Sequence, residues 1–185
     1  DVNAEKAEVL ITLDQVNSYL NQAGLDSIKR LPNLTWIDAT KAYYYSFDQK
    51  NNCVNLNLLD IDANNIKKVT SVPSNAENHT ITLPSLKVAY TIENNLYFAD
   101  GEKHVQVTDN PENVVAGQSV HRNEFAINGG IFWSPDGNKL AYYNMDESMV
   151  TDYPLVDITE RVATAKPIKY PMAGMKSHEV KLHVY

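Results

Sequence analysis

A serine in a short glycine-containing motif is the first candidate for chemistry in this sequence. Ser119 lies in Gly117-Gln118-Ser119-Val120-His121, which partly matches Gly-x-Ser-x-Gly, the motif that places a nucleophilic serine on a tight strand-to-helix turn. The last position holds His121 where that motif requires glycine, and no strand-turn-helix pattern surrounds it. We therefore predict that Ser119 is not a catalytic nucleophile.

The histidines and the acidic residues do not form a pattern typical of a metal site or an acid-base pair. None of the histidines stands four residues from another around a glutamate, and the single cysteine, Cys53, cannot supply a cysteine pair for zinc. Asp146 and Glu147 are adjacent, so their side chains point in different directions. We interpret this pair as a solvated loop and Cys53 as a buried thiol, and we predict no metal and no other cofactor.

A polar cluster, residues 121–125, separates a segment rich in valine and glycine from an apolar run that begins at Ile131. Its carboxylate, Glu124, has the chemistry to bind a cation or an amine. A charged residue in a loop is most often solvated surface, so the residues alone leave a binding role and an ordinary exposed position both open.

The composition argues against several classes of partner. Hydrophobic residues make up 43% of the 185 residues and charged residues 21%, which fits one globular core or a few repeats. The net charge of -7, with no run of lysine or arginine, argues against nucleic acid and anionic membranes. No stretch approaches the roughly 18 apolar residues that span a bilayer. The start at Asp1, without methionine or an apolar signal segment, leads us to expect a trimmed start.

The elements that must position these residues change in character along the chain. Thr12 and Gln15 form a Thr-x-x-Gln capping box, and Val16 and Leu20 follow at helical spacing until Gly24, so we expect a short helix near residues 13–22. From Leu31 onward, apolar residues alternate with polar ones in runs separated by clusters of Asp and Asn. These runs predict antiparallel hairpins.

A weak internal repeat groups these strands. An Ala-Tyr pair stands in a strand-like run at Ala42, Ala89 and Ala141, with spacings of 47 and 52 residues. Strand repeats of this length are typical of four-stranded propeller blades, since one small sheet cannot bury both of its faces alone. In the third repeat, residues 135–137 form a Pro-Asp-Gly turn between an aromatic and an apolar strand, which specifies fold and not chemistry.

The part of the chain from Gly117 to Gly174 resembles the dipeptidyl peptidase IV family of prolyl oligopeptidase-type serine peptidases, and especially its bacterial dipeptidyl and prolyl tripeptidyl members. Its motifs are, in order, His121-Arg122-Asn123-Glu124-Phe125, Phe132-Trp133-Ser134-Pro135 with Gly137 and Leu140-Ala141, Met145-Asp146-Glu147-Ser148-Met149-Val150, and Tyr170-Pro171-Met172-Ala173-Gly174. The strong resemblance covers roughly the last 70 residues, and the first 60 residues match only loosely.

The resemblance implies an all-β fold: a partial β-propeller of about three blades of an eight-bladed ring, with a short N-terminal helix. Residues 1–30 would form the N-terminal segment and residues 31–185 the incomplete propeller. The C-terminal α/β-hydrolase domain, which carries the Ser-Asp-His triad, would lie in the parent chain and not in these residues. The parent protein would be a periplasmic or secreted exopeptidase, with membrane association through a removed N-terminal segment left open.

The resemblance also implies a role for the polar cluster. Glu124 stands where the family has a glutamate that binds the free α-amino group of the substrate, with Arg122 and Asn123 beside it as substrate-binding residues. Vertebrate relatives have a Glu-Glu pair there, so a one-carboxylate anchor is implied. Ala126 stands where relatives usually have glycine, and a positive φ there would strain the segment.

The partners that follow from the resemblance are a peptide with a free N-terminus and proline at its second or third position, the hydrolase domain, and a possible homodimer. Nucleic acid is not expected. A different class of function stays open, because blade repeats alone require no enzyme: a stand-alone propeller that binds a partner or serves as a scaffold.

Overall fold

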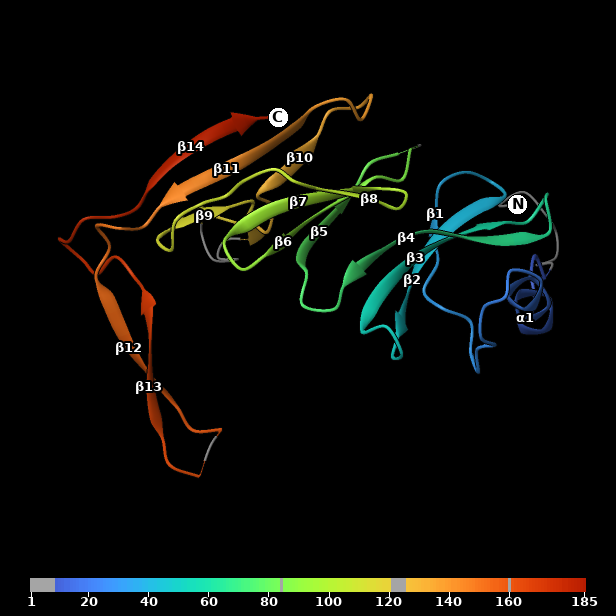
Figure 1. Cartoon of the computed structure of the whole chain (residues 1–185), viewed down its shortest axis with the longest axis horizontal. Helices are drawn as coiled ribbons and strands as arrows, with labels where there is room; N and C mark the ends of the chain where they lie inside the picture. Colours follow the sequence, from blue (N-terminus) through green and yellow to red (C-terminus); the bar gives the residue numbers. More distant parts are fainter. Residues whose placement is uncertain (1–8, 84, 121–125, 160) are drawn as a thin grey trace. The chain divides into compact units, whose positions relative to one another are not determined.

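The computed structural model describes residues 9–83, 85–120, 126–159 and 161–185 (Figure 1). The chain forms two compact units. The first holds the residues up to Ser74 together with Ala99–Lys103, and the second holds Asn75–Phe98 and His104–Tyr185.

The single helix of the described residues, α1 (Leu13–Gln22), begins at the predicted capping box. The Gln15 amide donates to Thr12 Oγ1 at 3.2 Å, and the Thr12 amide donates to Gln15 Oε1 at 2.8 Å. These two bonds satisfy backbone donors that the first turn of a helix leaves without partners. The chain turns away at Gly24, which has a φ of +70°, so the prediction for residues 13–22 is confirmed.

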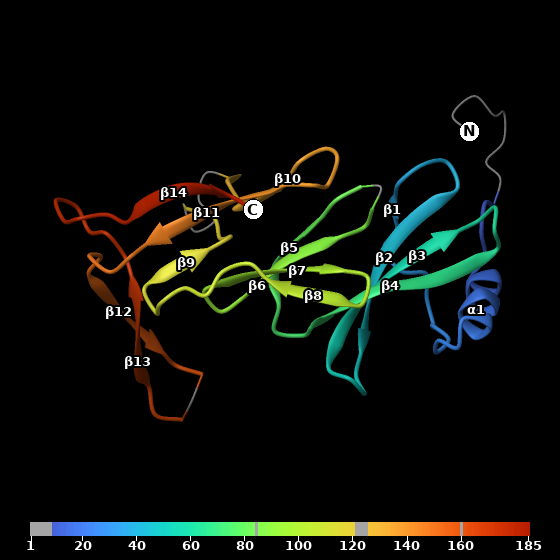
Figure 2. The ribbon, with the colours of Figure 1, turned by 45° about the horizontal axis from the view of Figure 1, so that its top comes forward.

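The first unit is a four-stranded antiparallel sheet with α1 packed on it (Figure 2). Its strands are, in spatial order, β1 (Thr35–Trp36), β2 (Lys41–Asp48), β3 (Cys53–Asp60) and β4 (Asn65–Pro73). The buried face of α1 joins one apolar cluster with the sheet; its members are Val16, Tyr19, Leu20, Tyr44, Leu59 and Ile66. Burial of this face provides most of the stability of so short a helix.

A second four-stranded sheet follows in the order β5 (Glu77–Ile81), β6 (Val88–Ile92), β7 (Asn95–Asp100) and β8 (Lys103–Gln106). The third sheet centres on β11 (Leu140–Asp146), which pairs with β9 (Val114–Ala116), β10 (Ile131–Trp133) and β14 (Glu179–Val184). One buried cluster in the second unit joins these two sheets: Ala89, Leu96, Ala116, Ile131, Leu140 and Tyr142.

A separate two-stranded ribbon pairs β12 (Asp152–Asp157) with β13 (Thr164–Lys169). In Figures 1 and 2 it extends away from the β9–β11–β14 sheet. Several of its apolar side chains are exposed, including Val156 at 68%.

The internal repeat in the sequence corresponds to the repeat of the sheets. Ala42 lies on β2, Ala89 on β6 and Ala141 on β11, so each Ala-Tyr pair falls on a strand of a different sheet. Ala42 and Ala89 are completely buried. The all-β class with one short helix is confirmed, whereas the number of blades in a complete ring stays a prediction.

The single cysteine departs from its predicted position. Cys53 is only half-buried, so the prediction of a buried thiol is wrong. The reason is local: Cys53 begins β3, opposite Asp48, beside the turn that joins the two strands, where the sheet covers little of it.

The Pro-Asp-Gly turn joins β10 to β11 as predicted, and its carboxylate fixes it. Asp136 accepts hydrogen bonds from Ser134 Oγ at 2.6 Å, the Asn138 amide at 3.1 Å and Asn138 Nδ2 at 3.0 Å. These bonds, that from Ser134 most of all, lower the pKa of Asp136 from 3.8 to about 2. Gly137 completes the turn with a φ of +67°.

This turn makes a prediction about acid stability. Because the pKa of Asp136 is lower in the folded chain, its ionised form stabilises the fold above pH 3.8, and this contribution is lost as the pH falls through about 2. A ¹³C NMR titration should give a midpoint near 2 for Asp136. In Asp136→Asn, the free energy of unfolding should fall less between pH 3.8 and about 2 than it does in the wild type. A titration midpoint of Asp136 near the ordinary 3.8 would contradict the hydrogen-bonded turn.

Candidate functional site

The substrate-binding residues predicted from the sequence, Arg122, Asn123 and Glu124, lie outside the described residues. The structure describes the segments that lead to them and away from them, residues 117–120 and 126–130.

The two flanking segments are held together at close range. Ser119 is 7% exposed, and its hydroxyl donates to the Ile127 carbonyl at 2.5 Å. At Gly130 a Cβ atom would collide with the backbone carbonyl of Gln118, so the chain can approach this closely only at a glycine. The described segments before and after residues 121–125 are therefore in direct contact with each other.

Ala126 has the positive φ that strains an alanine at this position. Its φ is +58°. An L-residue with a Cβ pays about 1–2 kcal/mol for this region, which glycine enters freely. The residue that follows the polar cluster is thus strained in this chain, and glycine there would relieve the strain.

A cavity of about 340 Å³ lies against the first flanking segment. It is lined by Glu77, Asn78, Asn94, Val115, Gln118, Ser119, Met145 and Glu147. The lining consists mostly of carboxylate, amide and hydroxyl groups, with no lysine or arginine among these eight residues. Such a lining suits a small polar ligand that donates hydrogen bonds or carries positive charge.

Glu147 lines this cavity, contrary to its interpretation as part of a solvated loop. It is 7% exposed, so the interpretation of Asp146 and Glu147 as a solvated pair is wrong for Glu147. The expected divergence of the two side chains is confirmed. Asp146 accepts a hydrogen bond from the Ser148 amide at 2.8 Å, which lowers its pKa, while Glu147 lines the cavity. The backbone of Glu147 is fixed by its amide, which donates to the Asn113 carbonyl at 2.8 Å.

Ser119, the serine of the partial Gly-x-Ser-x-Gly match, makes a hydrogen bond within the protein. It follows β9 in a loop, and its hydroxyl is directed to the Ile127 carbonyl. Within the described residues, no three histidine, cysteine or carboxylate side chains stand together as a metal site would require.

Repeated four-stranded antiparallel sheets joined by tight turns define a β-propeller type of module. The chain belongs to the dipeptidyl peptidase IV (DPP IV) N-terminal region family, which residues 33–185 match.

Solved structures agree with this assignment. The chain is similar to a Bacteroides ovatus protein described as a dipeptidyl aminopeptidase IV, at 42% identity and a TM-score of 0.79 over 97% of this chain. The fold of Porphyromonas gingivalis dipeptidyl peptidase 4 is also similar, with a TM-score of 0.68 at 21% identity over 99% of this chain. The partial propeller predicted from the sequence is thereby confirmed as the fold.

Curated fungal proteins give the same family. A "probable dipeptidyl-aminopeptidase B" of Phaeosphaeria nodorum is 34% identical over 53% of this chain, and one of Pyrenophora tritici-repentis is 32% identical over 64%. The matched region is 13% and 16% of those two proteins, and 24% of the Bacteroides ovatus chain. The chain therefore corresponds to a small part of each relative.

The contact between the two flanking segments can be tested with two neighbouring glycines. Gly130→Ala should destabilise the fold by about 1–3 kcal/mol, because the new Cβ meets a backbone carbonyl that cannot move aside. Gly129→Ala is the matched control, since its Cβ would meet only the Phe132 ring, at 3.4 Å. Chemical denaturation of both variants measures the difference. Equal stability of the two would show that the segments are not in close contact.

Proposed function

We propose that this chain is the propeller part of a post-proline exopeptidase, and that it recognises the N-terminal amine of a peptide and controls access without performing catalysis. The family match over residues 33–185 is the observation that carries the proposal. Members of the family named in the comparisons are dipeptidyl peptidases and aminopeptidases, enzymes that release residues from peptide N-termini. In this proposal a C-terminal α/β-hydrolase domain of the parent chain supplies the catalytic serine.

The amine anchor in this proposal is Glu124, with Arg122 and Asn123 beside it. A substrate ammonium that enters a partly dry cavity loses its water, and a carboxylate within hydrogen-bond reach offsets that cost. A peptide with a blocked N-terminus has no such charge and is rejected. The cavity beside the first flanking segment supports this role, because its lining is rich in carboxylate, amide and hydroxyl groups and none of its eight residues is lysine or arginine.

The contacts between the two flanking segments also support the anchor. An anchoring carboxylate must be held in place to discriminate between peptides that differ by one residue. The Ser119–Ile127 hydrogen bond and the close approach at Gly130 fix the chain on both sides. We leave dipeptidyl and tripeptidyl specificity both open, because a single carboxylate is compatible with either.

The cell compartment and the assembly belong to the proposal as well. We propose a bacterial, periplasmic or secreted parent protein that contacts its own hydrolase domain and forms a homodimer. The exposed apolar side chains of the β12–β13 ribbon are available for such an association. Among the described residues no helix is long and apolar enough to cross a bilayer.

The alternative function is a propeller that binds a partner or serves as a scaffold and joins no hydrolase. Similar blades occur in both classes, so the blades do not separate them. A Gly-x-Ser-x-Gly domain encoded after Tyr185 would favour the peptidase, and a stop codon there would favour the scaffold.

Kinetics of the full-length protein test the anchor. With Gly-Pro-p-nitroanilide and Ala-Ala-Pro-p-nitroanilide as substrates, Glu124→Ala should raise KM by roughly 10- to 100-fold, the value of a charge-assisted hydrogen bond to an ammonium. Glu112→Ala is the matched control on an exposed loop residue and should leave KM unchanged. If the wild-type protein hydrolyses neither substrate, the proposed peptidase activity is wrong. If Glu124→Ala is active with a normal KM, only the proposed binding of the substrate amine by Glu124 is wrong.

A further inference from the structure

Three side-chain amides line the cavity of the second unit, and each uses its nitrogen for a bond within the protein. The three are Asn78, Asn94 and Gln118. Gln118 Nε2 donates to the Glu93 carbonyl at 3.2 Å. Asn94 Nδ2 donates to the Glu112 carbonyl. A carbonyl oxygen only accepts, so these two bonds also determine which end of each amide is the nitrogen.

The third amide is oriented in the same way. Asn78 Nδ2 donates to Thr91 Oγ1 at 2.8 Å. The Thr91 hydroxyl donates in turn to the Glu77 carbonyl at 3.4 Å, so Thr91 Oγ1 is the acceptor in its bond with Asn78. The side-chain oxygens of all three amides make no hydrogen bond to any described residue. The lining therefore presents several acceptors to a ligand.

Two carboxylates stand among these amides in the lining. Glu77 is exposed at the start of β5, and Glu147 is 7% exposed directly after β11. No lysine or arginine is among the eight lining residues. Acceptor oxygens together with negative charge favour a ligand that carries positive charge and only donates hydrogen bonds.

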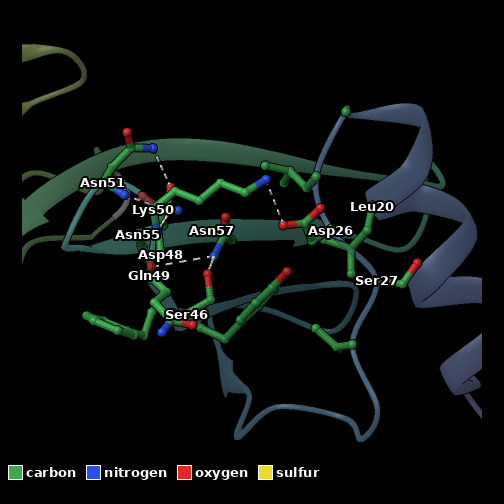
Figure 3. A pocket seen from close by; sticks show the side chains of 15 residues that line it. Leu20, Asp26, Ser27, Ser46, Asp48, Gln49, Lys50, Asn51, Asn55 and Asn57 are labelled. Atoms are coloured by element: carbon green, nitrogen blue, oxygen red, sulfur yellow. Dashed lines mark hydrogen bonds and ion pairs between the residues drawn. The ribbon is translucent and has the colours of Figure 1, made fainter.

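The cavity of the first unit differs in this respect. It has a volume of about 520 Å³, and its lining includes Tyr44 and Asn57 together with Asp26, Asp48 and Lys50 (Figure 3). Lys50 Nζ lies 4.0 Å from Asp26 Oδ2, so a lysine of the chain itself faces a carboxylate there. The cavity of the second unit has acceptors and carboxylates but no such lysine among its eight lining residues.

Lysine and arginine side chains of a ligand meet these requirements. An ammonium has three donors, a guanidinium has five, and neither group accepts a hydrogen bond. Both side chains have aliphatic stems, and Val115 and Met145 add apolar surface to the lining. A metal ion fits less well, because no three histidine, cysteine or carboxylate side chains of the described residues stand together.

The cavity lies beside both ends of the segment that carries the proposed amine anchor. Ser119 lines the cavity, and its hydroxyl donates to the Ile127 carbonyl at 2.5 Å. The described residues before and after Glu124 therefore meet at the cavity wall. In a peptide, the α-amino group and the side chain of the first residue are attached to the same carbon atom. A cavity next to an amine anchor is thus placed to receive that side chain.

We propose that this cavity binds the cationic side chain of the first residue of the peptide, so that the parent protein prefers substrates that begin with lysine or arginine. Glu77 and Glu147 are the specificity-determining residues, and the amide oxygens of the lining accept the remaining donors. The inference rests on the proposed function and adds a substrate class to it, because recognition of the α-amino group alone accepts any first residue.

Two substrates of similar shape test this preference in the full-length protein. Norleucine has the stem of lysine without the ammonium, so kcat/KM should be roughly 10- to 100-fold higher for Lys-Pro-p-nitroanilide than for norleucine-Pro-p-nitroanilide. Lys-Ala-Pro- and norleucine-Ala-Pro-p-nitroanilide provide the same comparison for a tripeptidyl enzyme. Glu77→Gln and Glu147→Gln should each reduce the ratio roughly 3- to 10-fold, because each removes one charge from the lining.

Glu102→Gln is the matched control. It removes the same charge from a side chain that is 82% exposed on the turn between β7 and β8, outside the lining, and should leave the ratio unchanged. Because Glu77 is exposed, its variant still tests the proposal if Glu147→Gln fails to fold.

Equal kcat/KM for the lysine and norleucine substrates would show that this inference is wrong, while their hydrolysis would still support the proposed function. A lysine preference that neither folded variant reduces would also overturn the inference, because the selection would then lie outside this cavity. If no substrate is hydrolysed, the proposed function is wrong, and the inference that rests on it fails with it.

Discussion

The close packing of two sheets in the second unit is the constraint on which the candidate site depends. Ala89 and Ala116 are fully buried between these sheets, together with Ile131 and Leu140. Gly117 follows directly, and a Cβ there would lie 3.0 Å from both the Ile131 and Thr91 side chains. After β9 the chain passes between the two sheets, and it can do so only because Ala116 and Gly117 are small. The positions of Gln118 and Ser119 in the cavity wall follow from that passage.

The same constraint explains how much the sequence could predict. The helix and the Pro-Asp-Gly turn depend on local chemistry, a Thr-x-x-Gln box and a glycine with positive φ, so their residues predict them. The Ala-Tyr repeat predicts the sheets because it recurs at the length of one four-stranded blade, and each of its three pairs falls on a strand of a different sheet. The burial of Glu147 has no local cause. It depends on Asn113 and on the contact of β9 with β11, residues distant in sequence, and so the pattern of residues could not indicate it.

Each unit carries a polar cavity. The lining of the cavity beside Ser119 and Glu147 includes no lysine or arginine, whereas the lining of the cavity over Tyr44 and Asn57 includes Asp26, Asp48 and Lys50. The proposed recognition of a substrate amine therefore rests on the second unit.

The proposed function requires that the parent protein act on peptides with a free amino terminus. The most direct measurement compares hydrolysis of Gly-Pro-p-nitroanilide with that of its N-acetylated form by the full-length wild-type protein. We expect rapid release of p-nitroaniline from the substrate with the free amine and almost none from the acetylated substrate. Equal cleavage of the two, or cleavage of neither, would contradict it.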